Sequence, residues 1–100
     1  MPNRHLDGHI TAHVQHIDRF GNCTTDMPGE WLQASAHWRF QIKGHEINKV
    51  GRTFGDVAEG EPMVLVDSTG FVAVAVRNGS AAQSMQLEID APIDVWPVSS

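Results

Sequence analysis

Three side chains of different chemistry lie in one five-residue stretch of the chain. Asp18 supplies a carboxylate, Phe20 a flat apolar ring and Asn22 a carboxamide. A carboxylate attracts a cation, a ring can stack on a base, and a carboxamide both donates and accepts hydrogen bonds at a purine edge. The combination predicts a site for a purine nucleoside that carries a positive charge.

A second stretch, Asp67-Ser68-Thr69-Gly70, separates two apolar runs and is typical of a tight turn. Ser68 could be drawn into a hydrolytic triad with a histidine and an aspartate. The strand-Gly-x-Ser-x-Gly-helix context that would expose such a serine is missing, however. We therefore interpret Ser68 as a turn hydroxyl or a ligand contact.

Six histidines and one cysteine suggest a metal site or a nucleophile as further hypotheses. The spacing of His9, His13 and His16 would suit a helix face, but the local pattern predicts a strand, on which His16 points away from the other two. No carboxylate or thiol completes a set at zinc spacing, so solvent-facing histidines are preferred. Cys23 has no cationic run beside it and is interpreted as a small core residue.

Other aromatic rings could also stack on a base. Trp38 alternates with polar neighbours and is assigned to the core, whereas Phe54 lies in a glycine-flanked loop where a ring is more available to a ligand. For Phe54, a core role and a ligand role both stay open on the residues alone.

The strand that leads into the first stretch is predicted by strict alternation. Ile10, Ala12 and Val14 share one side, which predicts a half-buried strand from residue 9. If the strand continues unbroken, Asp18 and Phe20 face the same side as these apolar residues. A bulge near Asp18 would reverse that orientation.

The rest of the chain is predicted to consist of short strands. Extended segments are expected at 22–25, 38–42, 45–50, 62–67, 71–76 and 93–98, with turns at 27–29, 43–45 and 68–70. A short helical turn or packed loop is expected at 30–36, and Ser80 is a candidate N-cap for a short helix. Pro92 and Pro97 are expected to limit the pairing of the last strand. These elements predict an all-β fold, a small Greek-key β-barrel of about seven strands with one short helix.

The bulk composition bounds the class of protein. One hundred residues suit one domain, which we place at 9–98 after a loose segment at 1–8. A net charge of −5 argues against nucleic acid as a partner, and no apolar run is long enough for a membrane span. A single cysteine excludes an internal disulfide and suits the cytoplasm.

Several ordered motifs together resemble the C-terminal domain of the S-adenosylmethionine (SAM) hydroxide adenosyltransferases, the family that includes SAM hydrolases and the fluorinating and chlorinating enzymes. The matching segments are Asp18 to Asp26, Thr53-Phe54-Gly55-Asp56, Ser68-Thr69-Gly70 and Arg77-Asn78-Gly79-Ser80-Ala81-Ala82. The resemblance runs from about residue 8 to residue 98.

The resemblance implies a role for each matching position. Asp18 would bind the ammonium of the methionine part, and Phe20 and Phe54 would line the adenine slot. Asn22 and backbone groups at Asn78 and Gly79 would hydrogen-bond the adenine. Ser68 and the backbone of Thr69 would hold the methionine carboxylate. SAM is then a substrate, and neither a cofactor nor a metal is expected.

Three positions depart from the family's pattern. Asp26 and Arg77 each stand where asparagine is usual. Thr69 stands where the halogenating enzymes have arginine and the hydrolases often serine, which favours water over chloride as the nucleophile. Family members are also longer, with an N-terminal α/β domain that has no counterpart in these 100 residues.

The resemblance therefore implies one half of a SAM hydrolase, which converts SAM and water to adenosine and L-methionine. The family's site lies between domains of neighbouring subunits in a trimer. The implied partners are therefore an N-terminal α/β domain of the same family, encoded with this chain or separately, and a homotrimer. Two alternatives stay open. The chain could be a binding module for adenosine or SAM without catalysis, alone or with a partner, or a structural β domain that has lost the ligand.

Overall fold

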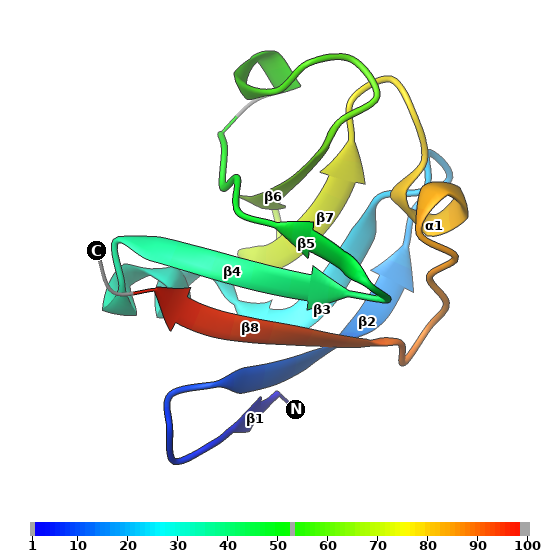
Figure 1. Cartoon of the computed structure of the whole chain (residues 1–100). Coiled ribbons are helices and arrows are strands. Elements are labelled where there is room, and N and C mark those ends of the chain that lie inside the picture. Colours follow the sequence, from blue (N-terminus) through cyan, green and yellow to red (C-terminus); the bar gives the residue numbers. More distant parts are fainter. Residues whose placement is uncertain (1, 53, 99–100) are drawn as a thin grey trace.

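The computed structural model describes residues 2–52 and 54–98, and strands dominate it (Figure 1). The strands are β1 Asn3–Arg4, β2 Ile10–Ile17, β3 Cys23–Pro28, β4 His37–Ile42, β5 His45–Ile47, β6 Pro62–Val66, β7 Phe71–Val76 and β8 Pro92–Val98. The helical elements are α1 Ala81–Ser84 and two 3-10 turns, η1 Gly29–Ala34 and η2 Phe54–Asp56. Ser80 caps α1 as predicted, because its hydroxyl accepts the Gln83 N–H at 3.1 Å.

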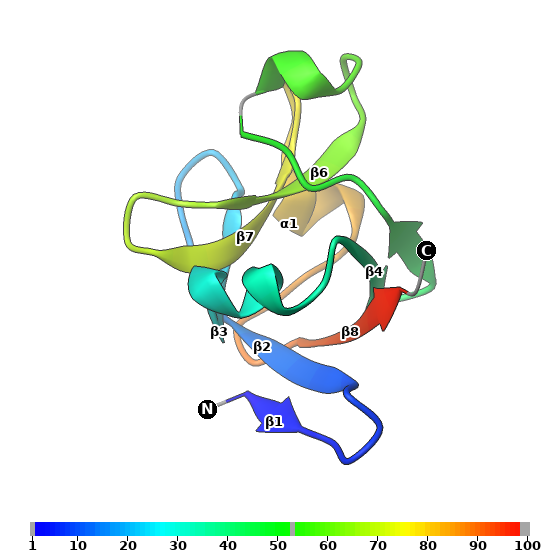
Figure 2. The same cartoon turned by 90° about the vertical axis from the view of Figure 1, so that its left-hand side faces the viewer.

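Seven of the strands form a nearly closed antiparallel barrel in the order β5-β4-β8-β2-β3-β7-β6, with β1 added beside β2 (Figures 1 and 2). The seam between the two end strands is bridged where the chain leaves β5. There Val50 pairs with Val64, the Gly51 N–H donates to the Val64 carbonyl, and the Val64 N–H donates to the Lys49 carbonyl, both at 2.9 Å. The predicted all-β barrel is thus confirmed.

Inward-facing apolar side chains fill the barrel. Ile10, Ala12 and Val14 are buried as their alternation predicts, and Trp38 and Cys23 lie in the same core. The largest fully buried side chains include Phe40, Met27, Ile42, Met63 and Ile93. In β2 and β4 alternation marks the buried face, because successive side chains point to opposite sides of the sheet, whereas β7 is buried on both faces from Val72 to Val76.

A bulge in β2 changes the orientation expected for the residues after it. Val14 pairs with Thr25 and His16 with Thr24, so two steps along β2 oppose one step along β3. Because of the extra residue, the side chains at the end of β2 point to the opposite face of the sheet from the one that unbroken alternation predicts. The strand does not continue unbroken to Phe20: it contains a bulge, as the alternative prediction had it, and ends at Ile17, so that Phe20 lies in the following loop and is 64% exposed.

Other strand predictions are corrected at the element ends. β3 runs through Pro28 into η1, so residues 27–29 are not a turn, and the regular strand after the hairpin at 43–44 ends at Ile47. β8 pairs with both β2 and β4, and the prolines limit this pairing only at their own positions. Pro92 pairs only with β2 and Pro97 only with β4, so each proline lies where β8 has a single neighbour.

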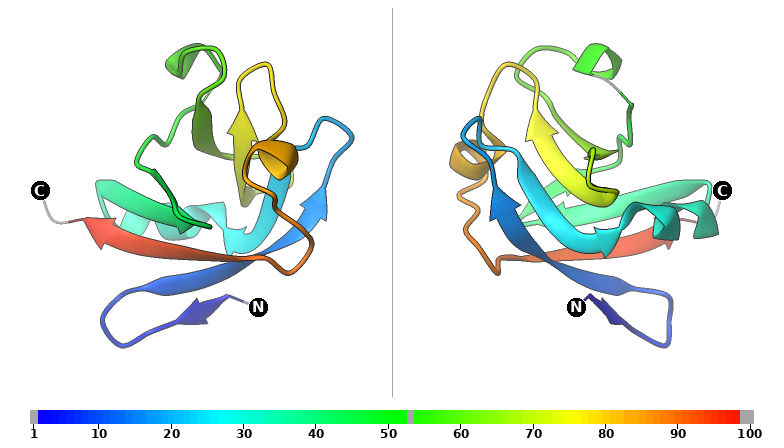
Figure 3. Two further views of the ribbon diagram at one scale, coloured as in Figure 1. Left: turned by 45° about the vertical axis from the view of Figure 1, so that its right-hand side comes forward. Right: turned by 180° about the vertical axis from the view of Figure 1, so that it is seen from behind.

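The segment expected to be loose begins with β1, which forms a hairpin with β2 away from the barrel (Figure 3). His5 holds this hairpin through a 3.0 Å hydrogen bond to Thr11 and through stacking on His9. His9 stacks in turn on Trp96 of β8, with ring centroids 4.4 Å apart.

No helix within residues 2–52 and 54–98 has the length and apolar character needed to cross a bilayer.

Candidate functional site

Three chain turns carrying predicted site residues converge on one side of the barrel. They are the β2–β3 loop at 18–22, the β6–β7 turn at 67–70 and the β7–α1 turn at 77–80. These turns are close because β2, β3, β7 and β6 are consecutive neighbours in the sheet. The strand order therefore gathers residues that lie up to 61 positions apart in the sequence (18 to 79).

Three hollows between these turns share lining residues and form one depression, which we name the β3–β7 groove. One end, of about 400 Å³, is lined by Phe20, Asn22, Val76, Asn78 and Gly79. The middle, of about 120 Å³, is lined by Asp18, Asn22, Thr24, Leu65, Asp67, Ala73 and Ala75. The other end, of about 460 Å³, is lined by Gln15, His16, Asp18, Thr24, Asp67, Ser68, Thr69 and Phe71. Seven of the eight predicted site residues line the groove: Asp18, Phe20, Asn22, Ser68, Thr69, Asn78 and Gly79.

Asp18 organises the β2–β3 loop with its own carboxylate. Oδ1 accepts the N–H groups of Phe20 at 2.9 Å and Asn22 at 3.0 Å, and Oδ2 accepts the side-chain amide of Asn22 at 3.1 Å. Partial burial is the largest single influence on the pKa of Asp18 and raises it, but the hydrogen bonds from Asn22 and Phe20 and the nearby His16 outweigh it. The net pKa of Asp18 is lowered, so the carboxylate is charged at neutral pH.

Asn22 and Phe20 present the rest of that loop to the groove. The Asn22 amide donates to Asp18, which fixes its orientation, while its Oδ1 accepts no hydrogen bond from any described residue. That oxygen can therefore accept a proton donor of a ligand. The Phe20 ring stands at the rim, with the Arg19 guanidinium 5.0 Å from its centroid. This loop thus offers a ring and a hydrogen-bond acceptor to the same end of the groove.

The β7–α1 turn closes that end from the other side. Asn78 adopts φ +55°, and the Gly79 N–H donates to the Val76 carbonyl at 3.1 Å. The amide of Asn78 makes no hydrogen bond to another described backbone group, so of these two it is the one available to a ligand. The turn is tied to the β2–β3 loop because the Ala82 N–H donates to the Gly21 carbonyl at 3.0 Å.

Asp67 organises the β6–β7 turn in the same way that Asp18 organises its loop. Oδ1 accepts the Thr69 N–H at 2.9 Å, the Phe71 N–H at 3.4 Å and the Thr69 hydroxyl, and Oδ2 accepts the Thr24 hydroxyl at 2.6 Å. Burial, the largest single influence, raises the pKa of Asp67, but the hydrogen bonds from Thr24, Thr69 and Phe71 lower it by more. The Thr69 N–H, which the resemblance assigns to a ligand carboxylate, is thus already bound to Asp67.

Sequence reasoning missed two residues in the middle of the groove, Thr24 and Asp67. A signal for Thr24 was available, because on β3 it lies two residues after Asn22 and so faces the same side. Asp67 stood beside the predicted Ser68, but only the pairing of β3 with β7 shows that its carboxylate reaches Thr24. Phe54 begins η2, and its side chain lies outside the described part of the structure.

Asp26 and Arg77, which stand where the family pattern usually has asparagine, have partners away from the groove. Asp26 accepts the backbone N–H of His13 at 2.8 Å and pairs with its ring at 3.3 Å. Arg77 donates to the Val57 carbonyl at 2.7 Å and so holds the loop before β6. Neither Asp26 nor Arg77 lines the groove, and both stabilise other parts of the barrel.

Other chemical hypotheses find less support in the described residues. No group of three histidine, cysteine or acidic side chains within 2–52 and 54–98 is placed to hold a metal ion. Cys23 is fully buried, and burial, with a smaller contribution from Asp18, raises the pKa of its thiol to about 11. A thiol with so high a pKa is a poor nucleophile at neutral pH.

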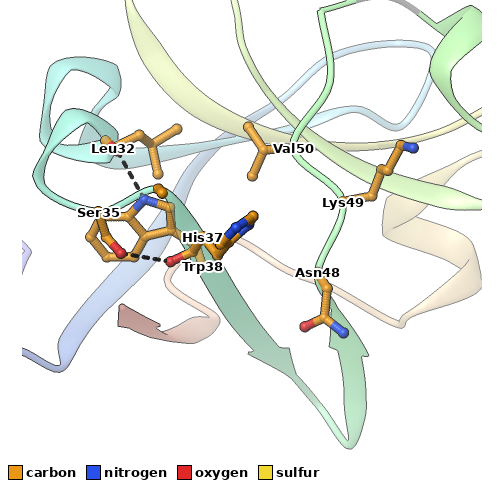
Figure 4. A pocket seen from close by; sticks show the side chains of 8 residues that line it. Leu32, Ser35, His37, Trp38, Asn48, Lys49 and Val50 are labelled. Atoms are coloured by element: carbon orange, nitrogen blue, oxygen red, sulfur yellow. Dashed lines mark hydrogen bonds between the residues drawn. The ribbon is translucent and has the colours of Figure 1, made fainter. Parts of the chain in front are cut away.

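A separate hollow of about 360 Å³ lies between η1, the start of β4 and residues 48–50 (Figure 4). Trp38 forms part of its wall and donates through its indole N–H to the Leu32 carbonyl at 2.9 Å. None of the predicted site residues lines this hollow. The β3–β7 groove is therefore the candidate site.

Comparisons with known proteins show the family to which the chain belongs. The model of the SAM hydroxide adenosyltransferase C-terminal domain family matches residues 12–94. An (R)-S-adenosyl-L-methionine hydrolase of Thermus thermophilus is 37% identical over 77 residues, which are 77% of this chain and 28% of that protein. A protein of the same description from Salinispora tropica is 44% identical over 73 residues, 73% of this chain and 27% of that protein. The chain thus spans little more than a quarter of the length of these relatives.

Solved structures share the fold. A crystal structure of an uncharacterized conserved protein from Thermotoga maritima superposes with a TM-score of 0.82 at 27% identity, covering 96% of this chain and 38% of that one. A conserved hypothetical protein from Thermus thermophilus gives a TM-score of 0.72 at 34% identity, covering 85% of this chain and 34% of that one. In both, the barrel is one part of a longer chain.

Proposed function

Because the chain belongs to the family of SAM hydroxide adenosyltransferase C-terminal domains, we propose that it forms the nucleoside-binding half of a SAM hydrolase. The reaction is SAM and water to adenosine and L-methionine. The observation that carries the proposal is the β3–β7 groove, which joins residues from three separate turns into one surface.

The end of the groove near Phe20 suits adenine. The exposed ring offers a stacking face, and Val76 supplies an apolar floor. The free Oδ1 of Asn22 can accept the adenine amino group, while the Asn78 amide can donate to a ring nitrogen from the opposite side. Together they satisfy the two-way hydrogen bonding of a purine edge.

The middle and far end suit the charged part of SAM. Asp18 is a fixed carboxylate beside the adenine end, and Ser68, which carries a hydroxyl, lines the last hollow. A carboxylate held by its own loop stabilises a sulfonium or an ammonium without having to reorganise when the ligand binds. The ligand then lies along the groove with its base at one end and its methionine part at the other.

Catalysis is a displacement at the ribose C5′, in which a water oxygen forms the new bond, the sulfonium sulfur leaves as methionine with the bonding electrons, and the water gives up one proton to solvent. Orientation of the reacting atoms is the main contribution that a binding surface of this kind can make. We assign that contribution to this chain and the activation of water to an N-terminal α/β domain of the kind found in the family. A homotrimer is the proposed assembly.

The test is calorimetric titration of the chain with adenosine and with SAM, with parallel incubation to detect released adenosine. Asn22→Ala should weaken the binding of both ligands by roughly tenfold, since each carries the adenine. Asp18→Asn should weaken SAM more than adenosine, because only SAM carries positive charge.

Equal losses for both ligands with Asp18→Asn would contradict the role of Asp18. Unchanged affinities with Asn22→Ala would contradict the adenine assignment. Release of adenosine by the chain itself would show that water is activated within these 100 residues.

A further inference from the structure

Asp18 holds Asn22 at three points. The Asp18 N–H donates to the Asn22 carbonyl at 3.0 Å, and Asp18 Oδ1 accepts the Asn22 N–H at 3.0 Å. The third contact joins the two side chains, since Asp18 Oδ2 accepts the side-chain amide of Asn22 at 3.1 Å. Because the backbone and the side chain of Asn22 are both bonded to one residue, the position and the orientation of its carboxamide depend on Asp18.

The charge of Asp18 decides which end of that carboxamide faces the ligand. An ionised carboxylate has no proton and can only accept hydrogen bonds. The NH₂ group of Asn22 therefore faces Asp18, and its Oδ1 accepts no hydrogen bond from a described residue. The opposite orientation would bring two acceptors together and lose a charge-assisted hydrogen bond, so fewer than about one molecule in ten should adopt it.

Asp18 does not line the end of the groove that suits adenine. That hollow is lined by Phe20, Asn22, Val76, Asn78 and Gly79. Of the three hollows, Asp18 lines the middle one and the one at the far end. Any influence of Asp18 on the choice of base must therefore pass through Asn22, which lines both the adenine end and the middle.

We propose that Asp18 is a positioning residue for base recognition, which holds the oxygen of Asn22 toward the ligand and so selects a purine with an amino group at C6. This inference rests on the proposed function and deepens it, because it gives Asp18 a task at the base in addition to its attraction for the charged part of SAM. Adenine carries the required amino group. Hypoxanthine carries an oxygen there instead, which would meet Asn22 Oδ1 as a second acceptor.

Asp18→Asn should reverse the orientation of Asn22. The new side chain keeps one oxygen, which can accept the backbone amides of Phe20 and Asn22, and has an NH₂ group in place of Oδ2. Asn22 then offers its own oxygen to that NH₂ group and turns its NH₂ group toward the ligand. A donor in this place suits the oxygen of hypoxanthine and no longer suits the amino group of adenine.

The test is an NMR titration of the ¹⁵N-labelled chain with adenosine and with inosine, the nucleoside of hypoxanthine, at about pH 7, where an aspartate is ionised. For the wild-type chain we expect the inosine Kd to exceed the adenosine Kd by roughly tenfold or more. Asp18→Asn should bring this ratio to about one or below. The backbone amide of Asn78 is the same in both proteins, so its contribution cancels when the two ratios are compared.

Asp90→Asn is the matched control. Asp90 is exposed, lines none of the three hollows and has φ +72°, a conformation that asparagine tolerates well. The same loss of charge at this position should leave the ratio unchanged. A general loss of stability weakens the binding of both nucleosides alike, whereas a reversed Asn22 changes their ratio.

A second measurement uses only the wild-type chain and so does not depend on whether Asp18→Asn folds. The side-chain amide protons of Asn22 should exchange with water more slowly than those of the exposed Asn3, because one of them is bonded to the Asp18 carboxylate. This difference should persist when adenosine is bound, since the base meets the other end of the carboxamide.

Three results would overturn the role of Asp18: a wild-type ratio near one, a ratio that Asp18→Asn leaves unchanged, or an Asn22 side chain that exchanges as fast as that of Asn3. If adenosine still binds in these cases, the proposed function survives without this role. If neither nucleoside binds, both proposals are overturned.

Discussion

At the scale of single residues, two aspartates perform the same physical task in two loops. Asp18 and Asp67 each gather backbone amides of the turn that follows them. Each thereby fixes a turn whose side chains line the groove, and each remains charged because the hydrogen bonds favour the carboxylate. Shape and charge of the groove are therefore set by the same two groups.

This arrangement predicts a pH dependence of stability. The pKa values of Asp18 and Asp67 are lowered in the folded chain, so the unfolded chain binds more protons in the acid range. Their contribution is fully present above the unfolded value of about 4 and is lost as pH falls through the lowered folded values. Asp67→Asn should reduce the free energy of unfolding by about 1–2 kcal/mol at pH 7, with a smaller difference in stronger acid.

Urea unfolding of both proteins at a series of pH values between about 2 and 7 measures this difference. A deficit of Asp67→Asn that stays constant down to the lowest pH would show that the carboxylate charge is not what stabilises the turn.

At the scale of elements, the groove depends on contact between the β2–β3 loop and the start of α1. Gly21 has φ +84°, and a Cβ at this position would overlap the side chain of Ser80, the N-cap of α1. Two turns that present Asn22 and Asn78 are held together at this point. A change here should therefore disturb binding as well as stability.

Gly21→Ala and Gly44→Ala form a matched pair that isolates this contact. Gly44 has φ +83°, but a Cβ there meets nothing within 4 Å. We expect Gly44→Ala to lower the free energy of unfolding by about 1 kcal/mol and Gly21→Ala by about 2–4 kcal/mol, since only the second adds a steric overlap.

Thermal and urea unfolding measure the two losses, and adenosine titration reports the groove. Similar losses for both variants, with unchanged adenosine binding, would mean that the Gly21–Ser80 contact does not hold the two turns together.

At the scale of the whole molecule, the barrel has one weak seam. β8 pairs along both edges, whereas β5 and β6 are joined through the single Val50–Val64 bridge and the two hydrogen bonds beside it. Local unfolding begins where the fewest contacts hold neighbouring segments together. The seam is therefore where the barrel should open first.

Amide hydrogen exchange tests this directly. The amides of Gly51 and Val64, which close the seam, should have protection factors at least roughly tenfold lower than the buried amide of Val14, which donates to Ala91. Exchange followed by ¹⁵N NMR in D₂O gives these values residue by residue. Equal protection at all three positions would indicate that the barrel opens only by global unfolding.

Local patterns in the sequence were sufficient to predict the all-β architecture. Strict alternation at 10–14 and 38–42 marked buried faces, and Gly70 and Ser80 marked a turn and a cap, because such patterns reflect local backbone and side-chain geometry. The family resemblance, which rests on short motifs, predicted eight site residues. Seven of them line the groove.

The way in which those residues face one another became visible only in the folded chain. The bulge in β2 depends on its register with β3, and the central place of β8 depends on pairing partners far along the chain. The hydrogen bond from Thr24 to Asp67 joins residues 43 positions apart. Long-range pairing sets such contacts, and no local pattern in the sequence encodes them.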